Sequence, residues 1–544
     1  MAEFDAVIVG SGINSLAAAA LLADAGWRVC VLEAKDELGG AVKTAELTVP
    51  GFRHDVFSAW HPLWVGGAAH AALGDELARH GLEYLNTDQP TATVFPDDEA
   101  AFLTTDTDGN AAELDRHSLG DGDTWRRVVG EFMPTADLAF GVLGTELWSL
   151  GGASLALKAY RQLGRRGLVE FTGALVQSSR DWLTETFASE RAHGLLAPWV
   201  LHTGLGPDSA TSGFMTKVIA VAIELGGMPV PRGGGATLVD ALAGFVRDRG
   251  GVLETGKEVD LVLVVDGRAV GIRTTDRDVI TAGRAVLCNV LPSQLYGRLL
   301  RDADLPERIG TSARRYRLGR SEMQIHFALS EPPRWNGDAR LARTAIVHLT
   351  PGLDGVSRAV NEAERGLLPA EATVVVGQPL AVDPSRAPDG RGMLWIQLQE
   401  LPWHVKGDAA GELDTGDGHW SEELREQYAD RIQERIARHV TNLDTAVLKR
   451  VALSPADLAT ANANLERGDP YGGSLALDQN FLWRPFAAQP GHRTPVERVF
   501  HIGASTWPGP GLGAGSGTLV AHELLRPATA SRALTRLRTL ARGG

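Results

Sequence analysis

Residues 4–40, "FDAVIVGSGINSLAAAALLADAGWRVCVLEAKDELGG", decide the fold. Residues 5–10 form an apolar run that is long enough for one buried strand and too short for a helix. Residues 16–25 are rich in Ala and Leu, which favour a helix, and Gly26 stands where that helix should end. A second apolar strand over residues 27–33 ends in an acid. This order of strand, glycine turn, helix, strand and acid predicts a unit that binds a dinucleotide.

The residues of the glycine turn have separate roles in such a unit. A side chain at Gly10 would obstruct the tight turn, and one at Gly12 would keep the backbone away from a pyrophosphate. Ser15 takes the place of the third glycine and is small enough to let the helix pack on the strand. The free amides at the helix N-terminus favour phosphate, and Glu33 can accept hydrogen bonds from a ribose 2′-hydroxyl. An ordinary βαβ unit without a ligand is the alternative.

Composition limits the class of protein and its partners. The chain has 544 residues, 44% of them hydrophobic and 22% charged, which is typical of a globular protein with room for more than one domain. A net charge of −14 argues against a nucleic-acid partner, because phosphate binding depends on Lys and Arg. Cys30 and Cys288 fall in predicted strands, so we expect core residues, not a disulfide or a metal site.

The start of the chain and one basic stretch bear on location. The first strand begins within five residues of Met1, which leaves no room for a signal peptide, so we expect cytoplasmic residence. No stretch approaches the roughly 18 apolar residues of a membrane-spanning helix. Residues 154–171, "SLALKAYRQLGRRGLVEF", suit an interfacial helix and a peripheral membrane contact. Gly164 weakens this helix, and a solvated helix in a surface cap is the alternative.

The rest of the chain divides into regions of different periodicity. Residues 66–226 are mostly helical in pattern and predict a lid, and a further helix is expected over 236–249. "EVDLVLVVDGRAVGIRTTDRDVITAGRAVLCNV" (258–290) alternates apolar and polar residues around a "DGR" turn, which indicates hairpin strands. Two strand regions, 320–350 and 373–400, predict a second sheet. A helix over 422–440 separates them from a last strand, an irregular loop and a helix that begins near Gly515.

Four segments together resemble a known family. These are the opening unit, the "E-x5-GG" of Glu33 to Gly40, "PRGGGATLVDAL" (231–242) and "HIGASTWPGPGLGAGSGTLVA" (501–521). The chain resembles FAD-dependent oxidoreductases of the phytoene desaturase type, and more narrowly the bacterial phytoene-dehydrogenase-like proteins related to pyridine nucleotide-disulfide oxidoreductase domain protein 2. The resemblance implies an α/β, two-domain flavoprotein of the glutathione-reductase and amine-oxidase type. Its Rossmann-like FAD domain would comprise residues 1–70, 226–300 and 490–544, with a helical cap over 71–225 and a mixed-sheet substrate domain over 301–489.

The resemblance also implies which residues hold FAD. The pyrophosphate is expected at Gly10 and Gly12, with Ser15 behind them, and the adenosine ribose at Glu33. Main-chain atoms of Val259 would bind the adenine. The paired glycines and the closing loop would approach the ribitol and the isoalloxazine; they are Gly39, Gly40, Gly503, Ala504, Gly511, Leu512 and Gly513. Amides around Gly511 to Gly515 would stabilise the anionic reduced ring.

Few groups are available for chemistry beside the flavin. His61 in "SAWHPL" is a candidate proton acceptor, although a histidine beside Pro and Trp is more often structural. His202 and Arg484 are further catalytic candidates, and for Arg484, as for Arg232, a loop-supporting salt bridge is an equal alternative. The pocket residues that we expect are Trp60, Trp507, Gln479 and His348. No metal-ligand spacing is present in the sequence.

The expected activity is hydride transfer from a lipophilic substrate, either isoprenoid or carotenoid-like or a secondary metabolite, to flavin N5. A flavin amine oxidase, an FAD-dependent isomerase or saturase, and a non-catalytic FAD-binding scaffold are the alternatives. The chain contains one dinucleotide unit and lacks a second one for a nicotinamide, so we expect the electrons to leave to oxygen, a quinone or another soluble acceptor.

Overall fold

The predicted dinucleotide unit forms the centre of the first sheet. The computed structural model describes residues 3–526. In it, β1 (Phe4–Val9) lies between β2 (Val29–Leu32) and β12 (Val279–Cys288), and the three strands run parallel. Two outer strands are also parallel to their neighbours: β9 (Val252–Glu254) beside β2 and β20 (Val499–His501) beside β12. The two strands predicted from the opening sequence are therefore confirmed.

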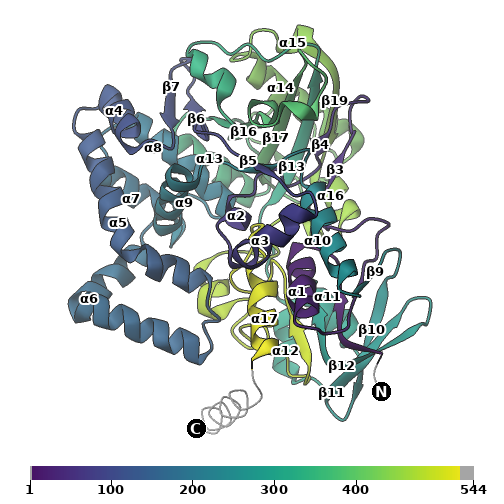
Figure 1. The fold of residues 1–544 in the computed structure, drawn as a ribbon. Helices are drawn as coiled ribbons and strands as arrows, with labels where there is room; N and C mark the ends of the chain where they lie inside the picture. Colours follow the sequence, from purple (N-terminus) through teal and green to yellow (C-terminus); the bar gives the residue numbers. More distant parts are fainter. Residues whose placement is uncertain (1–2, 527–544) are drawn as a thin grey trace.

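Helix α1 (Ile13–Asp24) follows the glycine turn, close to its predicted limits. Its Ala and Leu side chains are buried because helices cover it on both sides. These are α10 (Ala236–Asp248) and α17 (Gly515–Leu525). Figure 1 shows the purple α1 beside the yellow α17, so the first and last described segments of the chain lie together. The predicted helices over 236–249 and from Gly515 are confirmed.

An antiparallel extension completes the first sheet. Strands β10 (Val259–Val265) and β11 (Arg268–Thr274) pair with each other, and β11 then pairs with the start of β12. The turn between β10 and β11 is Asp266-Gly267, and both residues have positive φ, of 50° and 73°. Aspartate and glycine tolerate this conformation, which matches the twist of a two-residue hairpin. The hairpin predicted at "DGR" is thus confirmed.

The second sheet has seven strands and two different faces. Its order is β19-β13-β17-β16-β14-β6-β7. The limits are Val447–Leu453 (β19), Ser321–Leu329 (β13), Gly392–Leu401 (β17), Val374–Gly377 (β16), Ile346–Leu349 (β14), Thr91–Val94 (β6) and Ala100–Leu103 (β7). Alternate residues Met323, Ile325 and Phe327 pack in the core that also holds α14 (Glu422–Ala437). The side chains between them point to the opposite face.

Two strands of this sheet come from the range for which the sequence predicts a helical cap. β6 pairs in parallel with β14 and antiparallel with β7. Each has only four residues, so its periodicity is short, and β14, the strand that joins β6 to the rest of the sheet, lies far away in the sequence. Pairing of this kind depends on tertiary contacts and is not visible in local pattern. The other domain limits stay a prediction.

From residue 107 onward the predicted cap is mostly helical. Its helices are α4 (Thr107–His117), α5 (Asp121–Leu143), α6 (Leu150–Val176), α7 (Ser179–Thr186), α8 (Glu190–Leu196) and α9 (Ser212–Gly226). α5 and α6 form an arm at the left of Figure 1. Inside α6, Gly164 has φ 66° and ψ −179°, which interrupts the helix at the residue that weakened the sequence prediction.

Two further sequence predictions can be compared with the fold. Cys30 and Cys288 are buried in β2 and β12 as free thiols, which confirms that they are core residues. Over residues 3–526, none of the helices combines the length and the apolar character that crossing a bilayer requires.

Candidate active site

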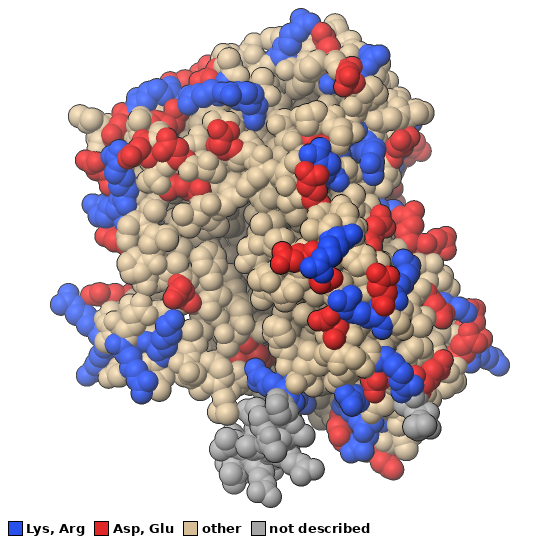
Figure 2. All heavy atoms as spheres, viewed as in Figure 1, with Lys and Arg blue, Asp and Glu red and all other residues tan. Residues whose placement is uncertain are grey.

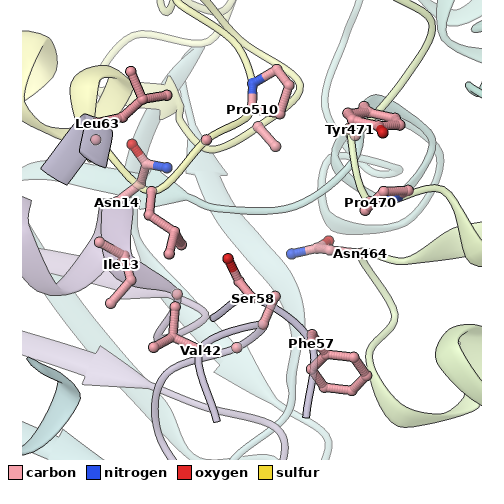
Figure 3. Close-up of a pocket in the computed structure, with 18 of the residues that line it drawn as sticks. Ile13, Asn14, Val42, Phe57, Ser58, Leu63, Asn464, Pro470, Tyr471 and Pro510 are labelled. Atoms are coloured by element: carbon pink, nitrogen blue, oxygen red, sulfur yellow. The ribbon is translucent and has the colours of Figure 1, made fainter. Parts of the chain in front are cut away.

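A cavity of about 1590 Å³ joins the two sheets. It begins at the glycine turn before α1 and ends at the face of the second sheet that points away from α14. In Figure 3, Ile13, Asn14 and Val42 lie across the open space from Pro470 and Tyr471. Typical small-molecule pockets measure about 300–1000 Å³, so this cavity has room for a dinucleotide and a substrate together.

Four residues of the predicted dinucleotide site converge on Asn289. A Cβ atom on Gly12 would lie 3.0 Å from the Asn289 amide nitrogen, and one on Gly503 would lie 2.1 Å from its amide oxygen. A Cβ on Gly10 would lie 3.2 Å from its carbonyl oxygen, and the amide donates to Ser15 Oγ at 3.0 Å. The absence of a side chain at the three glycines therefore leaves room for Asn289. Gly10, Gly12 and Asn289 line the cavity, whereas Ser15 and Gly503 stand behind it.

Sequence reasoning did not single out Asn289. It directly follows β12, the strand that pairs with β1, so its side chain emerges beside the glycine turn. A polar residue immediately after a buried parallel strand is the available signal, because ligands bind at the carboxyl ends of such strands. That signal requires knowing that residues 279–288 pair with β1, which the local pattern does not reveal.

Glu33 lies at the end of β2 and fixes the turn. Its Oε2 accepts from the Ser11 amide at 2.8 Å and from Ser11 Oγ at 2.7 Å, and its Oε1 accepts from the Lys35 amide at 3.0 Å. Ser11 Oγ in turn accepts from the Gly39 amide at 3.0 Å. Glu33 therefore ties the glycine turn to the paired glycines while it still lines the cavity.

At the paired glycines, Gly39 and Gly40, the backbone packs closely against neighbouring segments. Gly39 has φ +110°, and a Cβ there would lie 2.5 Å from the Val42 carbonyl oxygen. A Cβ on Gly40 would lie 3.2 Å from Gly12 Cα. The first amides of α1 have no partner within the helix, and Gly12 at its N-cap carries no side chain to cover them. Free amides beside side-chain-free backbone suit a pyrophosphate, so these residues fit a dinucleotide cofactor.

The closing loop forms another wall of the cavity. Ala504, Gly511, Leu512 and Gly513 line it, as the sequence predicts, and the loop leads directly into α17. The loop packs closely on Leu63 in α2 (Pro62–Val65): a Cβ on Gly511 would lie 2.5 Å from Leu63 Cδ1. Glycine at this position lets the loop approach α2.

Val259 lies where β10 begins and lines the end of the cavity beside Glu33. Its carbonyl oxygen accepts a hydrogen bond from Arg298 at 2.9 Å, and Arg298 also lines the cavity. The main chain of Val259 therefore faces the part of the cavity where the adenine is expected. Its carbonyl oxygen already accepts a hydrogen bond from the protein.

Tryptophans and histidines form part of the wall near the second sheet. Trp60, Trp199 and Trp395 line the cavity, and Trp199 stacks on His202 with ring centres 4.6 Å apart. His202 Nε2 lies 3.1 Å from His348 Nε2, so one imidazole donates and the other accepts. Burial lowers the pKa of His202 to about 4, which keeps it neutral near pH 7. His202 is the predicted catalytic residue that reaches the cavity, and His348 lies behind it.

A buried polar cluster lies on the same sheet face. Glu322 Oε2 accepts from Gln397 Nε2 at 2.9 Å, and Glu322 Oε1 lies 3.1 Å from Tyr471 Oη. Gln399 Nε2 donates to Tyr471 Oη at 3.2 Å. Burial raises the pKa of Glu322 to about 7. Sequence reasoning missed this cluster, although the alternating Glu and Gln residues of "SEMQIHF" and "WIQLQE" carry the signal.

His61 and Arg484, both catalytic candidates, lie outside the cavity lining. His61 is fully buried, caps α2 and bonds through Nδ1 to Tyr84 Oη at 3.0 Å. Arg484 is fully buried and donates to the carbonyl oxygens of Ala504 at 2.6 Å and Tyr471 at 3.0 Å. These positions favour structural roles, in which Arg484 joins the closing loop to the loop of the polar cluster.

Trp507 and Gln479, predicted as pocket residues, also lie behind the wall. Trp507 Nε1 donates to the Thr145 carbonyl at 3.1 Å, and Gln479 Nε2 donates to the Arg317 carbonyl at 2.8 Å. Arg232 forms a salt bridge with Glu83 at 2.6 Å near the surface. This is the alternative role expected for Arg232 from the sequence.

The glycine-rich segment 231–242, one of those that carry the family resemblance, is held by two aspartates. Asp55 Oδ1 accepts from the Gly235 amide at 2.8 Å, and its Oδ2 lies 2.9 Å from the buried guanidinium of Arg386. Asp383 Oδ2 accepts from the Gly233 amide at 2.6 Å. The two aspartates thus hold the glycine-rich turn before α10 in place.

The cavity opens to solvent between apolar side chains. Leu63, Phe140 and Leu225 line it and are also exposed, by 50%, 42% and 56%. Figure 2 shows a hollow near the middle of the viewed face, and the surface around it is largely free of charged groups. An apolar entrance of this kind suits a substrate with little charge.

These features define a two-domain dinucleotide-binding enzyme with one shared cavity, and the comparisons identify its family. The model for the flavin containing amine oxidoreductases matches residues 16–509, and the chain belongs to this family. It is a FAD-dependent oxidoreductase, which confirms the cofactor and the class of activity predicted from the sequence.

Relatives and solved structures agree with that assignment. The chain is 26% identical over 559 residues to pyridine nucleotide-disulfide oxidoreductase domain-containing protein 2 of Mus musculus, covering 96% of this chain and 94% of the relative. It is 23% identical over 538 residues to a neurosporene-forming phytoene desaturase of Rhodobacter capsulatus, covering 95% and 93%. The solved structure of a putrescine oxidase variant is similar in fold, with TM-score 0.59, 17% identity and coverage of 96% and 98%. The family resemblance and the predicted fold class are confirmed.

Proposed function

We propose that the protein is a dehydrogenase or desaturase that removes hydride from a lipophilic substrate, isoprenoid-like or a secondary metabolite. The single observation behind this proposal is the continuous cavity that joins the glycine turn to an apolar entrance. FAD, when bound, supplies the hydride acceptor. The phytoene desaturase among the relatives acts, by its name, on a hydrocarbon, which supports a lipophilic substrate here.

The chain itself provides binding, orientation and exclusion of water. We infer that Gly10, Gly12 and the first amides of α1 hold the pyrophosphate, and that Glu33 meets the ribose beside its bonds to Ser11. Gly39, Gly40, Val259 and the closing loop would cover the rest of the cofactor. The three tryptophans at the sheet end would surround the substrate and keep the reacting C–H bond dry. We infer that His202, which lines the cavity beside Trp199, meets the substrate.

The experiment is anaerobic reduction of the purified yellow protein by a panel of isoprenoids, carotenoid precursors, cyclic metabolites and amines. Bleaching of the flavin by an isoprenoid or a cyclic metabolite supports the proposal. Bleaching by amines alone would instead make the protein an amine oxidase, and the absence of bleaching by any compound would favour a scaffold. Reoxidation by oxygen is then compared with reoxidation by a quinone to identify the acceptor.

We also propose that α6 touches a membrane surface. None of its side chains is buried, and it exposes Leu157, Tyr160 and Val169 among its basic residues. The neighbouring α5 contributes Phe140 to the cavity entrance, so such contact would bring the entrance close to lipid. Sedimentation with anionic and neutral vesicles tests this: binding to anionic vesicles that is lost in Arg165→Glu/Arg166→Glu supports the contact, and equal recovery in the supernatant with both vesicle types contradicts it.

A further inference from the structure

We infer that the substrate carries a hydroxyl group, bound in the cavity by a polar subsite on the second sheet that consists of Glu322, Gln324, Gln397, Gln399 and Tyr471. The inference rests on the proposed function and refines its substrate class. It distinguishes this chain from an enzyme that accepts only hydrocarbons. All five residues line the same cavity as the glycine turn.

The register of the strands places the subsite residues on one face of the second sheet. Gln324 on β13 lies directly opposite Gln397 on β17 in an antiparallel pair. Glu322 and Gln399 each lie two residues away on the same strands, so all four side chains point to the cavity. The residues between them, Met323 and Leu398, belong to the opposite core.

The hydrogens of the cluster can be counted. Tyr471 Oη lies 2.7 Å from the Leu201 carbonyl oxygen and 3.1 Å from Glu322 Oε1, and its single hydrogen serves one of them. A carbonyl can only accept, so the shorter contact takes this hydrogen. Glu322 in its neutral form can then donate its own proton to Tyr471 Oη. Gln397 donates to the other oxygen of Glu322, so this arrangement satisfies both oxygens of a neutral acid.

Two acceptors in the subsite remain unused. The amide oxygens of Gln324 and Gln399 are buried and have no hydrogen-bond partner among residues 3–526. Both side chains are only 2% exposed. A buried acceptor without a donor is costly, and a hydrocarbon in the cavity would leave both unsatisfied. Because neither oxygen has accessible surface, a rotation of the amide toward a ligand that offers an O–H group would remove this cost.

The charge of the subsite favours a hydroxyl over other polar groups. A carboxylate has no hydrogen to donate to the amide oxygens and would be buried without a cation beside it. An ammonium would have a counterion only if Glu322 lost the proton that it donates to Tyr471. A neutral hydroxyl donates without introducing charge.

The subsite also lies close to the predicted flavin side of the cavity. A Cβ on Gly472 would lie 2.9 Å from Ala504 Cβ, so the loop that carries Tyr471 packs directly on the closing loop. Arg484 bonds to carbonyl oxygens of both loops. A hydroxyl held by the subsite would therefore fix the position of the substrate relative to the closing loop.

The test measures binding to the FAD-loaded protein, reduced with dithionite under anaerobic conditions so that no ligand is oxidised. The probes are two matched series: limonene, perillyl alcohol and perillylamine, and farnesene, farnesol and farnesylamine. Calorimetry should give a dissociation constant at least tenfold lower for an alcohol than for its hydrocarbon, although water solvates the alcohol better. If no alcohol in either series binds more tightly than its hydrocarbon and its amine, the inference is wrong.

Substitutions in the subsite test which residues cause the preference for an alcohol. Gln324→Leu and Gln399→Leu should each weaken alcohol binding about tenfold and leave hydrocarbon binding equal or tighter, since each removes an acceptor and adds apolar surface. Glu322→Gln should keep alcohol binding within a few fold, because an amide replaces a neutral acid. Gln162→Leu makes the same exchange on exposed α6 and should change nothing. Should the leucine variants lower FAD content and leave the preference for alcohol unchanged, the amides would face the cofactor and the inference would fail.

The hydroxyl subsite and the proposed dehydrogenase activity can fail independently of each other. Selective alcohol binding without flavin reduction by any lipophilic compound would reject the dehydrogenase and keep the subsite. Flavin reduction by hydrocarbons that bind more tightly than their alcohols would keep the dehydrogenase and reject the subsite. If a leucine variant fails to fold, the comparison of ligands on the unaltered protein still decides.

Discussion

The two ends of the cavity are built from different parts of the chain. At the glycine end the wall is main chain, and Gly12, Gly39 and Gly40 leave space by having no side chain. At the sheet end the wall is made of side chains, such as Glu322 and Gln399, that alternate strands project into it. Substitutions that add atoms should therefore disrupt the glycine end, and substitutions that remove polar atoms should disrupt the sheet end.

Adding a methyl group where two helices cross should have the largest effect. A Cβ on Gly517 in α17 would lie 1.9 Å from the Asn14 carbonyl oxygen, and backbone cannot move aside. Gly517→Ala should lower the free energy of unfolding by about 4 kcal/mol or more, measured by thermal or denaturant unfolding. Gly173→Ala in α6, where nothing lies within 4 Å of the new Cβ, is the matched control and should be as stable as the unaltered protein or up to about 1 kcal/mol more stable.

Adding a side chain in the turn itself should affect the cofactor more than the fold. In Gly12→Val, Cβ would lie 3.0 Å from Asn289 Nδ2, and the further methyls would enter the cavity. FAD affinity should fall by about tenfold to a hundredfold, as the cost of overpacking implies. The absorbance ratio of flavin to protein measures this loss, while circular dichroism should change little. Full flavin occupancy would contradict the site assignment.

At the sheet end, the neutral state of Glu322 predicts a pH dependence of stability. Burial raises its pKa from 4.5 to about 7, so the folded protein keeps a proton that the unfolded chain loses near pH 4.5. The neutral acid therefore contributes a few kcal/mol to the free energy of unfolding below pH 4.5. This contribution is lost as the pH rises to about 7. Unfolding at pH 5 and pH 8 should differ less in Glu322→Gln than in the unaltered protein. Equal pH dependence in both would show that Glu322 is ionised throughout.

A loss of FAD affinity similar in size to that in Gly12→Val is expected at Glu33. Glu33→Ala removes the acceptor of the Ser11 amide and the acceptor proposed for the ribose, so FAD binding should weaken by about 1–3 kcal/mol. Fluorescence titration of the apoprotein with FAD measures the change. Glu33→Gln keeps one acceptor oxygen and should lose less. Unchanged affinity in Glu33→Ala would remove this residue from the site.

The same contrast explains what the sequence could predict. The glycine turn, α1 and Glu33 are close together in the chain, and each residue type there has a direct backbone reason. Gly164 likewise indicated the break in α6 from its own conformational freedom. Local features of this kind need no knowledge of distant partners.

The sheet end was not predictable in the same way. Which of the alternating residues in β13 and β17 face the cavity depends on which side α14 covers, and that is a tertiary fact. Asn289 and strand β6 were missed for a related reason, since β1 and β14, beside which they lie, are far away in the sequence. His61 and Arg484 carry suitable chemistry in suitable motifs, yet packing turns both away from the cavity lining.

The pairing of β20 with β12 and of α17 with α1 has a consequence for biosynthesis. A ribosome adds about 5–20 residues per second, so roughly half a minute to two minutes separates the emergence of α1 from that of α17. During this interval the Ala- and Leu-rich side of α1 that α17 later covers has no cover, and the closing loop does not yet exist. Nascent chains should therefore emerge colourless and need protection from aggregation, and capture of the yellow cofactor follows translation.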